Sequence, residues 1–530
     1  MTEGIALETA VQRVEWWKSG LVYQVYPRSF QDSNGDGIGD LAGIEARLDH
    51  LETLGVDAIW ISPIYPSPMV DFGYDITDHC GIDPIFGDLE SFDKLIGAVH
   101  ARGMKLILDF VPCHTSDQHP WFVESRGGVG HAKRNWYIWK DPASDGGPPN
   151  NWLSEFGGSA WTFDPATGQY YHHAHLTEQP DLNWRNPHVV EAMLDVMRFW
   201  FARGVDGFRI DAVDQLIKDE AFRDNPPNPD WREGLAPTDR LLRTYQKDQP
   251  ELHALAARMR QVADEFGGRV LAAEAYLPFE KMAAYYGRDL DEFQMPFNFH
   301  LIGARWEART LARLIEDYEA SLPAGAWPNW VLGNHDRPRI ASRLGHAQAR
   351  VAAMLLLTLR GTPTIYQGEE LGMESVPIPP DRVMDPWERN VPGHGLGRDP
   401  VRTPIPWTNG PGAGFTTGEP WLPIDARPEL TAKFQSGDEN SMLSLYRKLI
   451  ALRRKEPSLS LGDFRLISAD DHILSYARGL PGARRIVITL NLSDQPCRNS
   501  ELGACILSTL DGNWNQPTLL RGNEGRITLG

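Results

Sequence analysis

Short apolar runs alternate with amphipathic stretches along most of the chain. The runs predict strands, and the stretches between them, whose apolar residues recur at helical spacing, predict helices. The predicted strands span residues 21–26, 58–64, 105–111, 206–213, 269–275, 292–297, 329–334 and 362–367. The predicted helices include residues 41–54, 91–101, 187–202, 252–266, 311–321 and 347–359.

The number of alternations predicts how the strands are arranged. Strands that alternate with helices form a parallel sheet, and eight such strands can close into a barrel. The expected fold class is therefore α/β, a (β/α)8 TIM barrel. An open, doubly wound sheet is the alternative, but no GxGxxG motif follows a predicted strand.

Two long excursions and one change of pattern divide the chain. The segment after the third strand is rich in turn formers and too long for a simple loop, so it predicts a small subdomain over the barrel mouth. A second Gly/Pro-rich excursion covers residues 371–423, and short alternating strands follow at 464–467, 472–476, 485–490 and 526–529. The predicted domains are a barrel in two parts (1–111 and 183–458), an inserted subdomain B (112–182) and a C-terminal all-β domain, a β-sandwich (459–530).

The composition indicates a packed globular protein and is compatible with a neutral substrate. Hydrophobic residues make up 42% of the 530 residues and aromatic residues 10%. A formal net charge of −19 weighs against nucleic acid as a partner, since phosphate binding needs clustered Lys and Arg. The 18 Trp and 15 Tyr could stack on sugar rings or simply fill the core.

The cysteines and the hydropathy pattern bear on compartment. Of the four cysteines, Cys80, Cys113, Cys497 and Cys505, none forms a CxxC pair, so no thiolate zinc site is expected. Residues 1–20 contain no apolar signal region, and no uncharged apolar run reaches membrane-spanning length. We expect a soluble, cytoplasmic protein with reduced cysteines and no membrane partner, a monomer or homodimer; a Cys497–Cys505 bridge stays open.

The most informative segment is Gly207-Phe-Arg-Ile-Asp211. Arg209 and Asp211 are two residues apart in a predicted strand, so both side chains leave the same face. A guanidinium beside a buried carboxylate should lower its pKa and keep it ionised, as a carboxylate nucleophile requires. Glu274 and Asp336 also end apolar runs. A single such acid would most simply cap the following helix, but three on successive strands indicate a site.

Residues at the carboxyl ends of barrel strands face the active-site mouth. In this chain they include Asp109, His114, Arg209 and His335 beside the three acids. Acidic groups with histidine donors suit the binding of sugar hydroxyls, and a pair of carboxyl groups, one ionised and one protonated, is what glycoside hydrolysis requires. Serine hydrolase chemistry is disfavoured because no GxSxG motif is present.

Four segments together resemble the signature regions of the α-amylase superfamily of glycoside hydrolases. They are Asp109-Phe-Val-Pro-Cys-His114, Gly207–Asp211, Ala-Ala-Glu274-Ala and Asn334-His-Asp336, and they occur in the family's order. Gln179-Pro-Asp-Leu-Asn-Trp184 and Arg402-Thr-Pro-Ile-Pro-Trp407 resemble the oligo-1,6-glucosidase/α-glucosidase branch.

The resemblance implies roles for individual residues. Asp211 would be the nucleophile that forms a covalent glucosyl-enzyme, Glu274 the acid/base, and Asp336 the group that holds ring hydroxyls. Arg209 would keep Asp211 ionised and oriented, and Arg402 would pair with Asp71 to close the pocket. The remaining substrate-binding residues would be Tyr74, as a stacking platform, His114, Phe156, His175 and His335.

Residues 32–40 carry oxygen donors at alternating positions, as a calcium loop does: Asp32, Asn34, Asp36, Ile38 and Asp40. Gly43 replaces the Glu of a full EF-hand, and a plain Asn/Gly turn is the alternative. In the α-glucosidase branch the same loop binds one structural Ca²⁺ or Mg²⁺, with Ile38 giving its carbonyl. No organic cofactor is implied.

Two departures from the family bear on function. Cys113 stands where most relatives have an Asn that supports a second calcium, so that second site is not expected. His175 stands where relatives of the branch usually carry Phe, which could change acceptor choice.

The function that we expect is an exo-acting, retaining α-glucosidase. In the branch that the chain resembles, Val after the nucleophile accompanies α-1,6 preference and smaller residues or Thr accompany α-1,4. Ala212 at this position therefore implies α-1,4 bonds, and transglucosylation is compatible with the same site. The alternatives are an oligo-1,6-glucosidase, a glucosyl-transferring or isomerising member such as a sucrose isomerase, a non-catalytic member such as a transporter heavy chain, and a carbohydrate-binding protein.

Overall fold

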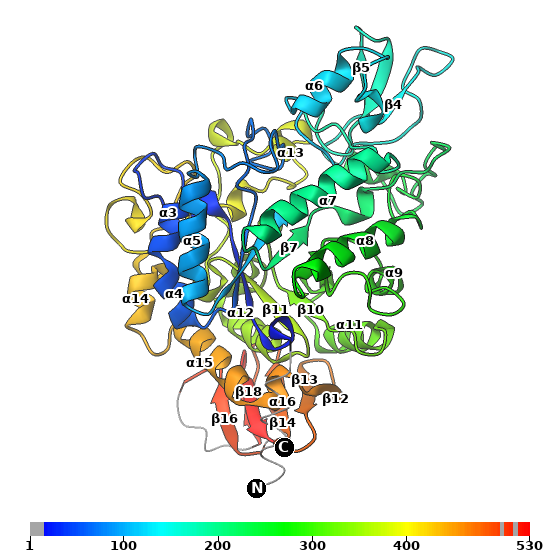
Figure 1. The fold of residues 1–530 in the computed structure, drawn as a ribbon. Helices are drawn as coiled ribbons and strands as arrows, with labels where there is room; N and C mark the ends of the chain where they lie inside the picture. Colours follow the sequence, from blue (N-terminus) through cyan, green and yellow to red (C-terminus); the bar gives the residue numbers. More distant parts are fainter. Residues whose placement is uncertain (1–14, 499–502, 512–517) are drawn as a thin grey trace.

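Eight parallel strands close into a barrel at the centre of the molecule, which confirms the predicted fold class (Figure 1). The structure is a computed structural model that describes residues 15–498, 503–511 and 518–530. The order around the barrel is β1-β11-β10-β9-β8-β7-β3-β2. The strands are β1 (Val22–Val25), β2 (Ala58–Ile61), β3 (Lys105–Phe110), β7 (Gly207–Ile210), β8 (Val270–Ala273), β9 (Met295–Asn298), β10 (Asn329–Val331) and β11 (Thr362–Tyr366).

The barrel strands are apolar because both of their faces are covered. β1, β2, β7, β8, β9 and β10 are buried at every position, as expected for a parallel sheet enclosed by helices. The helices are α2 (Trp16–Ser19), α3 (Leu41–Ala46), α4 (Leu48–Leu54), α5 (Leu89–Ala101), α6 (Pro120–Arg126), α7 (Pro187–Ala202), α8 (Leu252–Glu265), α9 (Phe279–Ala284), α10 (His300–Gly303), α11 (Ala308–Ser321), α12 (Ile340–Thr358), α13 (Pro386–Asn390), α14 (Ala432–Ser436), α15 (Met442–Lys455) and α16 (Pro457–Ser460).

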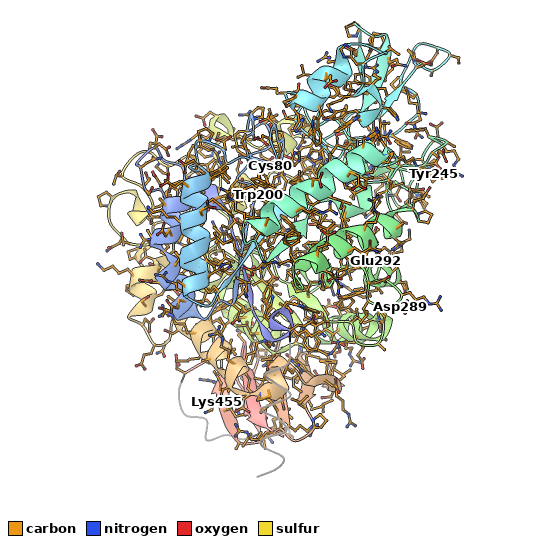
Figure 2. The ribbon with its side chains drawn as sticks, in the orientation of Figure 1. Cys80, Trp200, Tyr245, Asp289, Glu292 and Lys455 are labelled. Atoms are coloured by element: carbon orange, nitrogen blue, oxygen red, sulfur yellow. The ribbon has the colours of Figure 1, made fainter. Side chains whose placement is uncertain are left out.

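Side chains fill the space between the barrel and its helices. For example, the Trp200 indole on α7 donates a 2.8 Å hydrogen bond to the carbonyl of His79 (Figure 2).

Two smaller parts lie at opposite ends of the barrel (Figure 1). The segment after β3 contains α6 and a three-stranded sheet of β4 (Trp139–Lys140), β6 (Gln169–His172) and β5 (Trp161–Asp164). At the other end, a five-stranded antiparallel sheet runs β12 (Asp463–Ala469), β13 (Ile473–Gly479), β14 (Ile486–Asn491), β18 (Gly525–Leu529) and β16 (Cys505–Ser508), beside the pair β15 (Cys497–Arg498) and β17 (Leu519–Leu520).

The cysteines and the helices answer two questions left by the sequence. All four cysteines are free thiols, so Cys497 and Cys505 are not bridged. Within the described ranges, every helix falls short of the length and apolarity that a bilayer crossing requires. Residues 1–14, which form most of the segment that lacks an apolar signal region, lie outside the described part of the chain.

One buried arginine fastens the helices beside the C-terminal sheet. Arg453 on α15 is 2% exposed, and its guanidinium donates to four backbone carbonyls, those of Leu357, Leu359, Gly361 and Leu459. The end of α12, the turn before β11 and α16 are therefore held by one side chain. Its guanidinium donates to carbonyls, so its stability contribution depends mainly on these hydrogen bonds.

We expect Arg453→Met to lower the free energy of unfolding by about 3 kcal/mol, because buried carbonyls lose their donor. The neighbouring Arg454 is a matched control: it is half exposed and pairs with Asp57 at the surface. Arg454→Met should cost less than about 1 kcal/mol. Thermal unfolding followed by circular dichroism compares the two variants, and equal losses would show that the Arg453 contacts do not hold this region together.

Candidate active site

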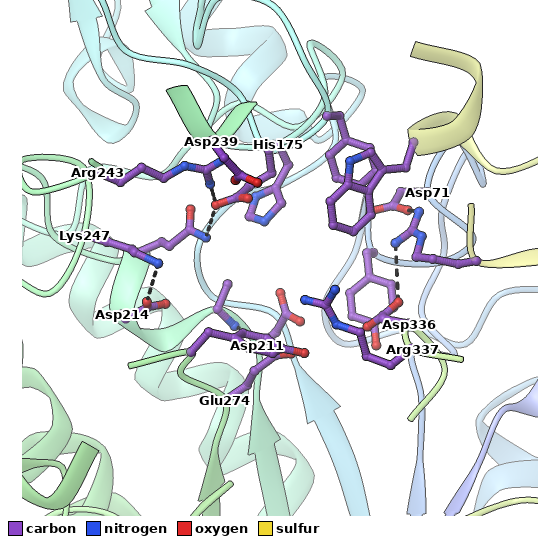
Figure 3. Close-up of a pocket in the computed structure, with 18 of the residues that line it drawn as sticks. Asp71, His175, Asp211, Asp214, Asp239, Arg243, Lys247, Glu274, Asp336 and Arg337 are labelled. Carbon is purple, nitrogen blue, oxygen red and sulfur yellow. Dashed lines mark hydrogen bonds and ion pairs between the residues drawn. The ribbon is translucent and has the colours of Figure 1, made fainter. Parts of the chain in front are cut away.

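A cavity of about 540 Å³ opens at the carboxyl ends of the barrel strands (Figure 3). This volume is in the usual range for a small-molecule site. Nine of the residues that the sequence predicted for a site line it, namely Asp71, Tyr74, His114, Phe156, His175, Asp211, Glu274, His335 and Asp336. Arg209 and Arg402 do not line it; their side chains lie buried behind its wall.

The floor of the pocket is organised by one guanidinium. Arg209 on β7 contacts Asp109 at 2.7 Å and Asp211 at 2.6 Å through Nη1, and Glu274 at 2.5 Å through Nη2. Arg209 pairs in register with Asp109 of β3 and with Ala272 of β8. Three neighbouring strands therefore deliver three carboxyl groups to a single cation that is 1% exposed.

The pKa of Asp211 moves opposite to the direction that the sequence predicted. Burial raises the pKa of Asp211 to about 6, and the opposing attraction of Arg209 does not overcome it. The Asp109 carboxylate shares the same Nη1 and adds to the increase. The expected depression was wrong because Arg209 is divided among three acids, but Asp211 is still mostly ionised at pH 7.

Glu274 has the opposite protonation state at neutral pH. Burial, together with the nearby carboxylates of Asp211 and Asp336, raises its pKa to about 8 against the attraction of Arg209. The contact with Arg209 favours the ionised form, but the effect of burial is larger. The floor therefore presents an ionised Asp211 beside a protonated Glu274.

The arrangement of these two acids restricts the chemistry. Two carboxyl groups held by the two terminal nitrogens of one guanidinium must lie close together. Retaining glycosidases have this short separation, whereas inverting enzymes leave room for a water molecule between their carboxyl groups. The floor can supply a carboxylate nucleophile and a proton donor to one bond.

Asp336 is held by two arginines in the pocket wall. It accepts a 2.7 Å hydrogen bond from Arg402 and lies 3.6 Å from Arg398. Although burial raises the pKa of Asp336, the neighbouring His335, Arg402 and Arg398 hold it well below the usual range. Burial also lowers the pKa of His335 to about 3, so the two arginines supply the charge that keeps Asp336 ionised.

The pairing predicted for Arg402 is corrected by the structure. Arg398, not Arg402, contacts Asp71, at 2.7 Å. The guanidinium of Arg398 is aimed by a second acid, Asp385, to which it donates through Nε and Nη2. The two arginines flank one turn of 3₁₀ helix at Asp399–Val401, and that turn directs Arg402 inward to Asp336 and to the carbonyl of His335 at 2.9 Å.

A strained loop presents Asp71 and Tyr74 to the pocket. Met69 and Phe72 have positive φ angles of 63° and 49°, a region that costs non-glycine residues energy. Asp75 compensates by accepting hydrogen bonds from the amides of Val70 and Asp71. The loop is thus fixed before any ligand enters.

Tyr74 and His335 form a stacked pair in the wall. Their rings are 5.6 Å apart at an interplanar angle of 5°, so a sugar could use only the opposite face of Tyr74. The Tyr74 hydroxyl bonds to Asp109 at 3.1 Å and to His335 Nε2 at 2.8 Å. The platform is therefore connected to the Arg209 cluster.

The opposite wall of the pocket was not predicted from the sequence. Arg243, which contacts Glu155, and Lys247, 3.5 Å from Asp214, lie across the cavity from Asp71 in Figure 3. Further unpredicted lining residues include Leu235, Asp239, Leu241, Leu242, Tyr276, Arg337, Trp387 and Arg398. Of these, only Arg398 had a usable signal, its closeness to the Arg402 motif. The rest lie on loops, apart from Trp387 on α13 and Asp239 in a 3₁₀ turn, and their approach to the pocket depends on the fold.

The predicted cation loop is ordered by its own hydrogen bonds. Asp32 accepts from the amides of Asn34, Gly35 and Gly37 and from the Thr416 hydroxyl. The side chains of Asn34 and Asp36 each accept a hydrogen bond from one backbone amide of the loop.

The donor set of this loop consists of oxygens only, which fits a hard cation. Within the described residues, one group of three His, Cys, Asp or Glu ligand atoms lies within 4.8 Å of one another, and it is not in this loop. Cation binding at the loop would therefore require the loop carboxylates to turn inward.

Comparisons with known proteins agree with this geometry. Residues 24–462 match the family model described as alpha amylase, catalytic domain. A probable alpha-glucosidase of Rhizobium meliloti (strain 1021) is 42% identical, covering 94% of this chain and 93% of the relative. An oligo-1,6-glucosidase of Halalkalibacterium halodurans is 39% identical over 89% of this chain and 90% of its own.

Among solved structures, an alpha-glucosyl transfer enzyme, XgtA, superposes with a TM-score of 0.92 at 38% identity, covering 98% of this chain and 100% of that chain.

We expect Glu274→Gln to stabilise the fold increasingly as the pH rises. The pKa of Glu274 is raised to about 8 in the folded chain against an ordinary value near 4.3. As the pH rises between these two values, the unfolded chain releases its proton first, so wild type loses stability. Glutamine has no proton to release in this range, so the variant does not lose this stability. The gap in melting temperature between variant and wild type should therefore be larger at pH 8 than at pH 5.

Glu316→Gln, at an exposed position on α11, controls for the loss of one glutamate. If the Glu274→Gln gap is independent of pH, the raised pKa is wrong.

Proposed function

The chain belongs to the α-amylase catalytic-domain family and is a glycoside hydrolase, and we propose that it is an exo-acting α-glucosidase acting with retention. Its substrates would be short oligosaccharides or simple α-glucosides with a free non-reducing end. The observation that carries the proposal is the pair Asp211 and Glu274 on one guanidinium at the floor of a pocket.

The two acids would divide the chemistry. The Asp211 carboxylate attacks the anomeric carbon while Glu274 donates its proton to the leaving oxygen, giving a glucosyl-enzyme ester and the released aglycone. The Glu274 carboxylate then takes a proton from water, whose oxygen displaces Asp211 and restores both groups. Two inversions give net retention. The higher pKa of Glu274 supplies the proton in the first step.

The wall around Asp336 would bind the terminal sugar. Asp336 is ionised and can accept from two ring hydroxyls, His114 and His335 lie beside it in the pocket, and Tyr74 offers one free face for stacking. Because the Asp71–Arg398 pair crosses the far side of this wall, a chain could not extend past the terminal unit. This closure supports exo action rather than cleavage within a polymer.

Linkage preference would depend on Ala212. This residue is in the left-handed conformation with φ 44°, lines the pocket, and donates its amide to Glu274 at 3.3 Å. Its small side chain leaves room beside the proton donor, which supports α-1,4 over α-1,6 bonds.

Glucosyl transfer is the second candidate function. The relative titled an alpha-glucosyl transfer enzyme is 38% identical to this chain, and the match covers 98% of this chain and 100% of the relative. Leu235, Leu241 and Leu242 form an apolar part of the pocket lining, where an acceptor other than water could be held against the glucosyl-enzyme.

A substrate panel tests the proposal. Maltose, isomaltose, sucrose, trehalose and p-nitrophenyl α-glucoside are incubated with the enzyme, and the products are followed by NMR. We expect α-glucose as the first product, faster release from maltose than from isomaltose, and a loss of about 10³-fold or more in Asp211→Asn. Asp317→Asn, exposed on α11, is the matched control.

β-Glucose as the first product would contradict retention. Isomers of sucrose as the main product would favour the isomerase alternative, and Asp211→Asn with wild-type turnover would remove Asp211 from its assigned role.

We also propose one structural Ca²⁺ or Mg²⁺ in the loop of Asp32, Asn34, Asp36, Ile38 and Asp40. Its support is the oxygen-only donor set and the network that presents Asp32. Although burial raises the pKa of Asp32, hydrogen bonds from Thr416 and the loop amides hold it below the usual value. The ion would join this loop to the Thr416 segment and take no part in catalysis.

We expect chelation to lower the melting temperature of wild type by several degrees and added Ca²⁺ or Mg²⁺ to restore it, because ligand binding to the folded state stabilises it. Asp36→Ala should abolish both responses, since it removes a donor from the exposed part of the loop. A melting temperature that chelation leaves unchanged, with no metal found by elemental analysis, would remove the ion from the account.

For compartment and assembly, we propose a cytoplasmic monomer or homodimer. Four free thiols support a reducing compartment, and the net charge of −19 supports good solubility.

A further inference from the structure

Three potential metal ligands meet in the pocket wall. Cys113 and His114 follow β3, and His175 follows β6. One ligand atom from each lies within 4.8 Å of the other two. No other group of three or more His, Cys, Asp or Glu in the described ranges meets this condition. The histidine rings of His114 and His175 are 4.8 Å apart.

Hydrogen bonding leaves His114 in the form that a metal requires. Its Nε2 is 3.0 Å from the carbonyl oxygen of Tyr74 and 3.1 Å from the side-chain nitrogen of Gln179. The carbonyl only accepts, so its hydrogen bond places the proton on Nε2, and the Gln179 amide then donates to Asp71 alone. Nδ1 then has a free lone pair, and this atom is buried with no hydrogen-bond partner. A backbone carbonyl that fixes the tautomer in this way is the usual support of a metal-binding histidine.

His175 offers a second free nitrogen. Its Nδ1 is also buried without a hydrogen-bond partner. Two unpartnered ring nitrogens in one wall are costly unless something satisfies them.

Cys113 completes the group. Its Sγ is fully buried, 3.8 Å from Lys218 Nζ and 3.8 Å from the Asp181 carboxylate. Asp181 neutralises Lys218 through an ion pair, so the lysine does not leave an unbalanced charge beside the thiol. Metal binding would replace the S–H bond by an S–metal bond, with the proton released to solvent.

We propose that Cys113, His114 and His175 bind one thiophilic divalent cation, with Zn²⁺ as the best fit, and that this cation inhibits the enzyme. One thiolate and two imidazoles with a fourth position open are a ligand set that Zn²⁺ takes in proteins, and the open position would face the pocket. Zinc bonds of about 2.0–2.3 Å require the three donors to close in by side-chain rotation. Ca²⁺ and Mg²⁺ prefer oxygen, so this site is distinct from the Asp32–Asp40 loop.

The inhibitory part rests on the proposed function. His114 and His175 line the pocket, and a bound cation would occupy their free nitrogens and the space that a terminal sugar needs. The acidic wall formed by Asp71, Asp211 and Asp336 would attract a dication electrostatically. The sequence predicted no thiolate zinc site because it contains no CxxC pair. That criterion does not cover a site made of one cysteine and two histidines that the fold brings together.

Metal binding tests the site without reference to activity. Metal-free wild type is titrated with Zn²⁺ by calorimetry and with Co²⁺ by absorption spectroscopy, where a thiolate ligand gives a charge-transfer band. We expect one site that shows this band. Cys113→Ser should lose the band and bind Zn²⁺ at least tenfold more weakly, while Cys80→Ser, which removes another partly buried thiol, should behave as wild type.

His175→Phe gives an independent check in case Cys113→Ser fails to fold, and melting curves report folding for each variant. We expect His175→Phe to weaken Zn²⁺ binding at least tenfold as well. A wild type without a thiolate band, or folded variants that bind Zn²⁺ as wild type does, would overturn the site. If Zn²⁺ binds at this site but does not compete with a glucoside substrate, the metal site stands. The inhibition by the cation and the proposed role of these histidines in sugar binding would then be wrong.

Discussion

The active site depends on the burial of one arginine among three carboxyl groups. Arg209 is too deeply buried to be solvated, and removal of a partner from such a cluster would leave an uncompensated charge. The register of β3, β7 and β8 brings Asp109, Asp211 and Glu274 to it. Because a single positive charge serves three acids, it cannot hold all of them ionised, and Glu274, whose pKa is raised the most, is left with a proton. The acid and the nucleophile therefore arise from one electrostatic constraint.

A second pair of arginines separates binding from chemistry. Arg402 and Arg398 hold Asp336, and Arg398 also holds Asp71. These contacts fix the wall that would receive the terminal sugar, while Arg209 fixes the floor. The Asp336 side of the pocket is charged and held by ion pairs. The rest of the pocket lining carries long side chains and leucines. We therefore expect that part of the lining to set the specificity for the group bonded to the terminal sugar.

Much of the fold and the floor of the site could be predicted from the sequence, because strand ends in a parallel barrel converge. The run at 206–213 predicted β7, found at Gly207–Ile210, and so placed Asp211 correctly beside Glu274. The partner of Asp71 could not be predicted, because Arg398 and Arg402 differ only in the direction in which one helical turn aims them. The pKa of Asp211 was misjudged because the sequence shows the adjacent Arg209 but not the competing Asp109. The grouping of Cys113 with His175 depends on how the inserted segment folds back.

The pH dependence of kcat/KM tests the central claim most directly, measured for wild type on an α-glucoside whose leaving group needs a proton and for Glu274→Gln on an aryl α-glucoside whose leaving group needs none. The account predicts a bell-shaped curve for wild type, with limbs at about 6 from Asp211 and about 8 from Glu274. Activity falls below the first limb because the nucleophile is protonated, and above the second because the acid is ionised. In Glu274→Gln the alkaline limb should disappear while the acid limb stays. An alkaline limb that survives this substitution would contradict the assignment of the two protonation states to the Arg209 cluster.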